Sequence, residues 1–118
     1  MKVLIVEDDA LVALDLADVL VGLGHEVVGP CMSAEAALAN YRSATVDYGL
    51  LDFNLGAGTS AVVADALADG GTPYAFVTGY RAEALPARFR SVPMLAKPLS
   101  STDLRALLQS VDRREPRS

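Results

Sequence analysis

The chain has 118 residues, of which 52% are hydrophobic, a formal net charge of −5 and a sequence pI near 4.6. This length and composition predict one domain with a substantial hydrophobic core and exclude a disordered chain. The acidic balance disfavours a nucleic-acid partner, because nucleic-acid binders normally carry a basic face. Cys31 is the only cysteine, so an internal disulfide is impossible and a reducing compartment is expected.

Neither a membrane helix nor a signal peptide is expected. No apolar run reaches the roughly 18 residues that a membrane helix needs. The chain starts with Met1-Lys2, continues into a short apolar run and then meets three acids at 7–9, which is unlike a secretion signal. We therefore expect a cytoplasmic domain that has no membrane partner.

Strands and helices alternate in the N-terminal half of the chain. In chain order, the pattern predicts a strand over 2–6, a helix over 10–23, a strand over 26–29, a helix from Ser33 to about 42 and a strand over 46–51. Gly24 is typical of a helix end, and Ser33 is typical of an N-cap. The strand over 26–29 is short and is expected near an edge of the sheet.

The C-terminal half continues the alternation, with one unclear segment. In chain order, the pattern predicts a flexible loop over 56–58, a helix from Thr59 or Ser60 to about 69, a strand over 74–77, a strand over 92–96 and a last helix that begins near Ser100. Ser100 and Asp103 resemble a capping box. Pro86 interrupts the segment 79–91, so a short or mobile helix is expected there. The domain is predicted to span 1–112, with a polar tail over 113–118.

This alternation determines the predicted fold class. Five strands separated by helices are typical of an α/β domain with a doubly wound, five-stranded parallel sheet. The crossovers between parallel strands are expected to be right-handed. In such a sheet the carboxyl ends of the strands share one edge, and that edge is where ligands bind.

Polar residues follow four of the five predicted strands. Asp52 follows the run 46–51 and is the most informative residue of the chain, because a carboxylate at the end of a buried strand lies where the sheet meets solvent. The acids at 7–9, Thr78 and Lys97 follow three other strands. The sequence therefore predicts one site that contains several acids, one hydroxyl and one lysine.

Each of these residues also has a purely structural interpretation. The acids at 7–9 suit the start of a helix, and Asp52 alone is more typical of a turn or an N-cap. Thr78 with Gly79 suits a plain turn, and lysines such as Lys97 are usually on the surface. Four such coincidences at four strand ends would be needed together, so the functional interpretation is favoured.

The same residues carry a resemblance to a known family. Over essentially its whole length, the chain resembles a response-regulator receiver domain of the CheY-like superfamily, whose fold is flavodoxin-like with strand order 2-1-3-4-5. The active site of that family consists of an N-terminal acid pair, an aspartate after strand three, a serine or threonine after strand four and a Lys-Pro after strand five. The matching residues here are Glu7 and Asp8, Asp52, Thr78, and Lys97-Pro98.

The resemblance implies that Asp52 is the nucleophile and forms an aspartyl phosphate. The carboxylates of Glu7, Asp8 and Asp52 would repel one another in one cleft unless a cation intervened. Mg²⁺ suits such a site, because it is a hard ion that prefers oxygen ligands and keeps several waters. Asp8, Asp52 and the backbone carbonyl of Asn54 are the expected direct ligands, and Glu7 is expected to act through water.

Two further side chains are expected to act on the phosphoryl group. Lys97 supplies a point charge for a phosphoryl oxygen, and Thr78 supplies a hydroxyl donor that rotates toward it. The resemblance also suggests a cis peptide bond before Pro98, which would aim the lysine into the cleft.

The residues expected to transmit the signal depart from the usual pattern. Receivers usually carry an aromatic residue three positions before the lysine, but Met94 stands there, a side chain that repacks easily. Residues 76–80, Phe-Val-Thr-Gly-Tyr, are similar to the FATGUY receivers, although Val77 replaces the usual alanine. Those receivers are common in alphaproteobacteria and pair with sensor kinases of the HWE or HisKA-2 type. Our hypothesis is that Tyr80 replaces the missing aromatic.

Together these features predict a phosphoacceptor in a two-component phosphorelay, which catalyses only its own phosphoryl transfer and dephosphorylation. The expected donor is a sensor histidine kinase or a histidine phosphotransfer protein. Phosphorylation is expected to alter the face formed by the segment 79–91, the strand over 92–96 and the last helix, which binds a downstream protein. His25, the only histidine, is expected far from the cleft and is not interpreted as a phosphate donor or a ligand.

Three alternative functions share features with this pattern. A haloacid-dehalogenase-like phosphatase needs a second aspartate two residues after the nucleophile as general acid, but Asn54 stands there. A flavin or nucleotide binder is disfavoured because the chain has no glycine-rich phosphate loop of a known type. A phosphate-independent interaction module stays open, although a cluster of uncompensated acids would be costly without a function.

Overall fold

The computed structural model describes residues 1–56, 58–79, 85–97 and 99–113. Residues 112 and 113 are described by their backbone only. The elements are, in chain order, β1 (Lys2–Val6), α1 (Ala10–Gly22), β2 (Glu26–Cys31), α2 (Ala34–Ser43), β3 (Tyr48–Leu51), α3 (Ala61–Asp69), β4 (Tyr74–Thr78), the 3₁₀ helix η2 (Ala87–Phe89), β5 (Met94–Ala96) and α4 (Ser101–Arg113). Within this part of the chain, no helix combines the length and the apolar composition needed to cross a membrane.

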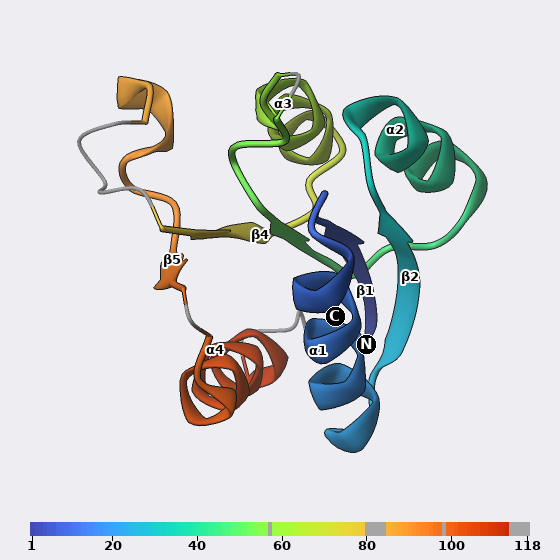
Figure 1. The fold of residues 1–118 in the computed structure, drawn as a ribbon, viewed down its shortest axis with the longest axis vertical. Helices are drawn as coiled ribbons and strands as arrows, with labels where there is room; N and C mark the ends of the chain where they lie inside the picture. The colour runs from blue at the N-terminus through green and yellow to red at the C-terminus, as the bar shows by residue number, and fades with distance from the viewer. Residues whose placement is uncertain (57, 80–84, 98, 114–118) are drawn as a thin grey trace.

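The strands form one five-stranded sheet in the order β2-β1-β3-β4-β5, with every neighbouring pair parallel (Figure 1). This confirms the predicted α/β fold and its 2-1-3-4-5 strand order. β2 lies at one edge of the sheet, as expected from its short pattern, and β5 lies at the other.

Helices cover both faces of the sheet (Figure 1). On the face of α1 and α4, a cluster of buried side chains includes Leu16, Leu50 and Leu104. On the face of α2 and α3, a second cluster includes Leu51 and Val63. Adjacent residues of β3 thus pack into different clusters, because side chains alternate across a strand. All four residues of β3 are buried.

The predicted end of the second strand was wrong. The pattern predicted a strand over 26–29, but β2 continues to Cys31. The pairing register with β1 shifts just before Cys31, and Gly29 has a positive φ of 99° there. A side chain at Gly29 would place its Cβ 2.6 Å from the Cys31 nitrogen, so only glycine fits this irregularity. The central and opposite edge strands are shorter than predicted, since β3 begins at 48 and β5 at 94.

The helix starts follow the predicted caps with one exception. The hydroxyls of Ser33 and Ser100 accept hydrogen bonds from backbone N–H groups three residues later, at 3.1 and 3.2 Å. Ser60 occupies the N-cap of α3 but makes no capping bond with its side chain. Thr59 accepts a hydrogen bond from Ala61 N at 3.3 Å instead.

The unclear segment between β4 and β5 holds a short 3₁₀ helix, η2, in agreement with the expectation of a short helix there. Leu85 and Phe89 of this segment are buried in the cluster on the α3 face. The helical pattern over 80–84 falls outside the described residues. At the other end, α4 runs to Arg113, one residue into the predicted tail, and the rest of that tail also lies outside the described residues.

Candidate functional site

Polar side chains meet at the carboxyl edge of the sheet. Two backbone hydrogen bonds continue the pairing of the strands by one residue: Asp52 N donates to Val6 O at 2.8 Å, and Lys97 N donates to Thr78 O at 3.3 Å. The first bond holds Asp52 beside the acids that follow β1. The second holds Lys97 beside the end of β4. The sheet itself therefore gathers residues that are far apart in the sequence.

Three carboxylates are close together at this edge. Glu7, Asp8 and Asp52 each offer an oxygen atom, and these atoms lie within 4.8 Å of one another. Glu7 is 1% exposed and Asp52 is 6% exposed, whereas Asp8 is exposed to solvent. Two acids thus line the floor of the site and the third stands at its rim.

Lys97 supplies positive charge to this acid cluster. Its Nζ donates a hydrogen bond to Oδ2 of Asp52 at 3.0 Å and lies 2.9 Å from Oε1 of Glu7. Burial lowers the pKa of Lys97, but the two carboxylates outweigh burial, so its pKa is raised overall. Lys97 therefore stays protonated and bridges the two buried acids.

The balance at Glu7 is different. Burial raises the pKa of its carboxyl group, and contact with Asp52 adds to the rise. The Lys97 ammonium and the Asp9 N–H, which donates to Oε2 of Glu7 at 3.1 Å, lower the pKa but do not cancel the effect of burial. Glu7 is therefore the member of the cluster whose negative charge is costly to keep.

Asn54 belongs to the loop that leaves the site. Its backbone N–H donates to Oδ1 of Asp52 at 3.2 Å, so both carboxylate oxygens of Asp52 have a donor. Its side-chain oxygen accepts a hydrogen bond from Gly56 N at 3.0 Å. The Asn54 side chain is thus used to shape the loop.

The structure describes some of the remaining predicted residues. Thr78 is 2% exposed at the end of β4, and Met94 is half-buried in β5, where it pairs with Phe76. Tyr80 and Pro98 fall outside the described residues. His25 precedes β2, at the opposite end of the sheet, and its Nδ1 lies 3.0 Å from the N-terminal amine of Met1. It is remote from the acid cluster, as expected.

Comparisons with known proteins agree on one family. No protein-family profile matches the chain. The chain is 33% identical to the phyllosphere-induced regulator PhyR of Methylorubrum extorquens in an alignment 130 residues long. This alignment covers 97% of this chain and 47% of PhyR. Its structure superposes on SdrG of Sphingomonas melonis Fr1 with a TM-score of 0.83 and 36% identity, over 94% of this chain and 95% of SdrG. It superposes on the response-regulator REC domain of Erythrobacter litoralis PhyR with a TM-score of 0.83 and 27% identity, over 99% and 92%. The chain belongs to the response-regulator receiver domains.

This receiver domain spans about half the length of the curated relative that it matches, with 47% of Methylorubrum PhyR covered. Receiver domains are signalling modules of two-component systems, and this chain shares their fold.

Sequence reasoning missed the aromatic cluster behind the site. The ring of Phe53, which follows the buried aspartate, packs edge-on against Phe76 and Phe89, with centroid distances of 5.6 and 6.4 Å. Phe89 belongs to η2, and the neighbouring Arg88 donates two hydrogen bonds to the carboxylate of Asp65 in α3. The sequence contains the three phenylalanines of this cluster, but only the fold determines that their rings pack against one another.

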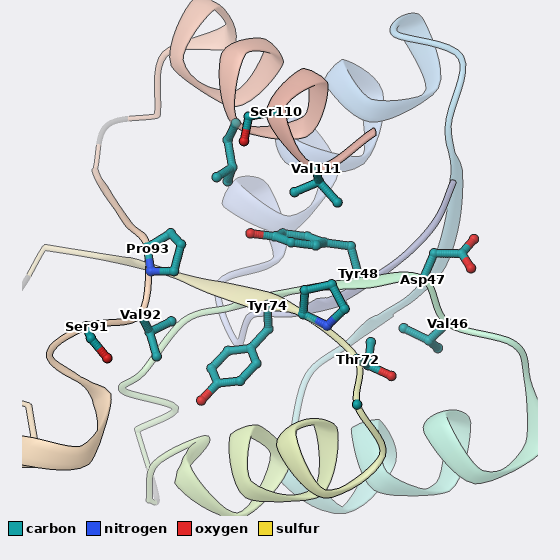
Figure 2. A pocket seen from close by; sticks show the side chains of 13 residues that line it. Val46, Asp47, Tyr48, Thr72, Tyr74, Ser91, Val92, Pro93, Ser110 and Val111 are labelled. Carbon is teal, nitrogen blue, oxygen red and sulfur yellow. The ribbon is translucent and has the colours of Figure 1, made fainter. Parts of the chain in front are cut away.

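The receiver also has a hollow at the opposite edge of the sheet, where the strands begin. Figure 2 shows this amino-edge hollow, which has a volume of about 700 Å³ and lies between the starts of β3, β4 and β5 and the end of α4. Of the two tyrosines that line the hollow, Tyr48 belongs to the hydrophobic cluster on the face of α1 and α4, and Tyr74 packs against the cluster on the face of α2 and α3. The acid that lines the hollow, Asp47, accepts a hydrogen bond from Lys2 N at 2.8 Å. Among the residues that the structure describes, no polar residue predicted for the site lines this hollow.

Proposed function

We propose that this receiver accepts a phosphoryl group on Asp52 and that the modification changes the surface offered to a partner protein. One observation carries the proposal: a buried aspartate at the carboxyl edge of the sheet is paired with a lysine and lies beside two further acids. Lys97 Nζ lies 3.0 Å from the Asp52 carboxylate, and oxygen atoms of Glu7, Asp8 and Asp52 lie within 4.8 Å of one another. A structural ion pair would need only one of these acids.

The proposed reaction is a phosphoryl transfer from a histidine. A carboxylate oxygen of Asp52 attacks the phosphorus atom of a phosphohistidine, a P–O bond forms, and the P–N bond breaks. The imidazole leaves with the electron pair of the broken bond. Lys97 binds a phosphoryl oxygen in exchange for its present carboxylate contact, and the Thr78 hydroxyl donates a hydrogen bond to another oxygen. The side chains of the site would accelerate the reaction mainly by positioning the reacting groups and stabilising charge, as is general for phosphoryl transfer.

The donor atoms of the site fit a magnesium ion. All three clustered side chains offer carboxylate oxygens, and oxygen is the ligand that Mg²⁺ prefers. We propose that Asp8, Asp52 and the backbone carbonyl of Asn54 are direct ligands and that Glu7 acts through a water molecule. When bound, the ion neutralises negative charge in the site and on the incoming phosphoryl group.

The proposed output runs through the end of β4. Thr78 moves toward the phosphoryl group, and the face formed by η2, β5 and α4 changes its population of conformations. Met94 replaces the usual aromatic of β5, so Tyr80 is proposed as the moving aromatic and Pro98 as the residue that directs Lys97. Replacement of Tyr80 with alanine should abolish the response of this face to phosphorylation; an unchanged response would remove Tyr80 from the proposal.

The proposed upstream partner is a sensor histidine kinase, of the HWE or HisKA-2 type by the resemblance of residues 76–80, or a histidine phosphotransfer protein. The proposed downstream partner is another protein. In support of a protein partner, the PhyR relative is a regulator, and the matched domain of Erythrobacter litoralis PhyR is the REC domain of a response regulator.

The test is the mass of the intact protein after incubation with acetyl phosphate, with and without Mg²⁺. Three proteins are compared: wild type, Asp52→Ala and Asp47→Asn, the last being an acid of the amino edge. Wild type and Asp47→Asn should gain one phosphoryl group in the presence of Mg²⁺, and Asp52→Ala should gain none. The same three proteins are then titrated with beryllofluoride, which mimics the phosphoryl group.

An adduct in Asp52→Ala would assign the phosphoryl group to another residue. No adduct and no beryllofluoride binding in wild type would replace the proposal with a phosphate-independent interaction module of the same fold.

A further inference from the structure

One glycine of the site comes unusually close to an acid. Gly56 lies in the loop between β3 and α3 and has a positive φ of 78°. A Cβ atom added at Gly56 would lie 3.1 Å from Oδ2 of Asp8. That distance is shorter than ordinary van der Waals contact, so one of the two groups would have to move by a few tenths of an ångström.

The backbone on either side of Gly56 is held by hydrogen bonds. Gly56 N donates to the side-chain oxygen of Asn54 at 3.0 Å, and Leu55 N donates to Gly58 O at 2.9 Å. These bonds close the loop on both sides of Gly56. Asp8, in contrast, is an exposed side chain at the rim of the site. An added methyl group would therefore displace the Asp8 carboxylate.

We propose that Gly56 is a positioning residue of the metal-binding corner: its lack of a side chain leaves the Asp8 carboxylate the space in which it faces Asp52. This inference rests on the proposed function, since it concerns the same magnesium ion. Mg²⁺ demands near-ideal ligand positions at about 2.0–2.1 Å and tolerates little displacement. A shift of the Asp8 oxygen by a few tenths of an ångström is large on that scale.

A simpler explanation for Gly56 is its backbone conformation. A positive φ favours glycine at any turn, whatever lies next to it. The chain offers a control for this explanation, because Gly71 has a similar φ of 74° but a Cβ there would meet nothing within 4 Å. Gly58 is a second control, in the same loop and also with open space around its Cβ position.

The experiment measures the Mg²⁺ dissociation constant of the whole chain by calorimetry, together with the thermal midpoint without metal. Wild type is compared with Gly56→Ala, Gly71→Ala and Gly58→Ala. Gly56→Ala and Gly71→Ala should both lower the thermal midpoint, because both place alanine at positive φ. Only Gly56→Ala should also weaken Mg²⁺ binding, by about tenfold, as is typical when the support of a metal ligand is lost.

Asparagine provides a second pair if alanine prevents folding. Gly56→Asn and Gly71→Asn carry the same Cβ atoms, and asparagine tolerates positive φ better than other residues. The expected contrast in Mg²⁺ affinity is the same for this pair.

Two outcomes would overturn the inference. One is a Gly56 variant that binds Mg²⁺ within about twofold of wild type, well inside the loss expected for a displaced ligand. The other is a loss of affinity in Gly71→Ala as large as in Gly56→Ala, which would assign the effect to backbone strain. Absence of Mg²⁺ binding in wild type is a different result: it overturns the proposed function itself, and with it this inference.

Discussion

The two edges of the sheet differ in what their side chains bring together. At the carboxyl edge, oxygen atoms of three carboxylates lie within 4.8 Å of one another, and Lys97 bridges the two acids that are buried. At the amino edge lies the hollow of about 700 Å³, which is lined mostly by apolar and small polar side chains. Its acid, Asp47, is engaged with the backbone of Lys2. The proposed site is therefore the edge where charged groups converge, and the hollow lies at the opposite edge.

The difference follows from parallel strands. Each strand of a parallel sheet ends at the same edge, so a polar residue placed after each apolar run is brought to one place. The residues before the strands meet at the other edge, where Val46, Pro73 and Pro93 line the hollow. Four predictions test this division of roles, from the largest expected effect to the smallest.

The largest effect is expected at the charged group of the carboxyl edge. Lys97→Met removes the ammonium that neutralises phosphoryl charge, and the rate of phosphorylation by acetyl phosphate should fall by about 100-fold, a typical loss for one electrostatic stabiliser. The other lysine of the chain, Lys2, lies at the amino edge. Lys2→Met should keep the wild-type rate; equal losses in both variants would erase the distinction between the edges.

The second effect concerns stability at the amino edge. Tyr48 is 1% exposed, and Tyr48→Leu should lower the free energy of unfolding by about 2 kcal/mol through lost packing. The yield of phosphorylated protein under folding conditions should not change. Urea denaturation measures the first quantity and intact mass the second. A variant that is stable but cannot be phosphorylated would show that the amino edge takes part in the chemistry.

The third effect is stabilisation by metal. At a Mg²⁺ concentration ten times its dissociation constant, the free energy of unfolding should rise by about 1.4 kcal/mol, because the ion binds only the folded state. Asp8→Asn should lose most of this gain, and Asp47→Asn should keep it. Thermal melts with and without Mg²⁺ provide the measurement. Equal gains in both variants would place the ion away from the acid cluster.

The smallest effect is expected for an ion pair outside both edges. Arg88 and Asp65 lie 3.1 Å apart, with side chains 55% and 50% exposed. Because solvent screens such a pair, Arg88→Gln should cost less than about 1 kcal/mol in the free energy of unfolding. It should leave phosphorylation unchanged. A loss comparable to that of Tyr48→Leu would mean that the cation–π contact of Arg88 with Phe89, at 4.3 Å, anchors η2 more strongly than the ion pair alone.

Sequence reasoning succeeded where the signal was local. An apolar run that ends in a polar residue locates both a strand and its functional end, and Asp52 and Lys97 follow β3 and β5 as predicted. It failed at the end of β2, because Gly29 and Pro30 usually stop a strand and the register shift that carries the strand past them depends on pairing with β1.

The contacts within the site were beyond a local pattern. Lys97 reaches Glu7 as well as Asp52, and 90 residues separate Glu7 from Lys97 in the chain. The sequence predicts that both lie at one edge, but not that the lysine bridges two acids. The close approach of Gly56 to Asp8 likewise depends on how a loop folds back over a neighbouring strand end, and the sequence around Gly56 predicted only a flexible loop.

The burial of β3 has a consequence for signalling. This strand pairs with a neighbour on each side, and its side chains are enclosed by a separate hydrophobic cluster above and below the sheet. Asp52 therefore follows a strand that is paired on both sides and fully buried. If Asp52 takes up the proposed phosphoryl group, we expect this strand to stay fixed and the conformational response to arise in side chains around it and in β5, which is paired on one side only.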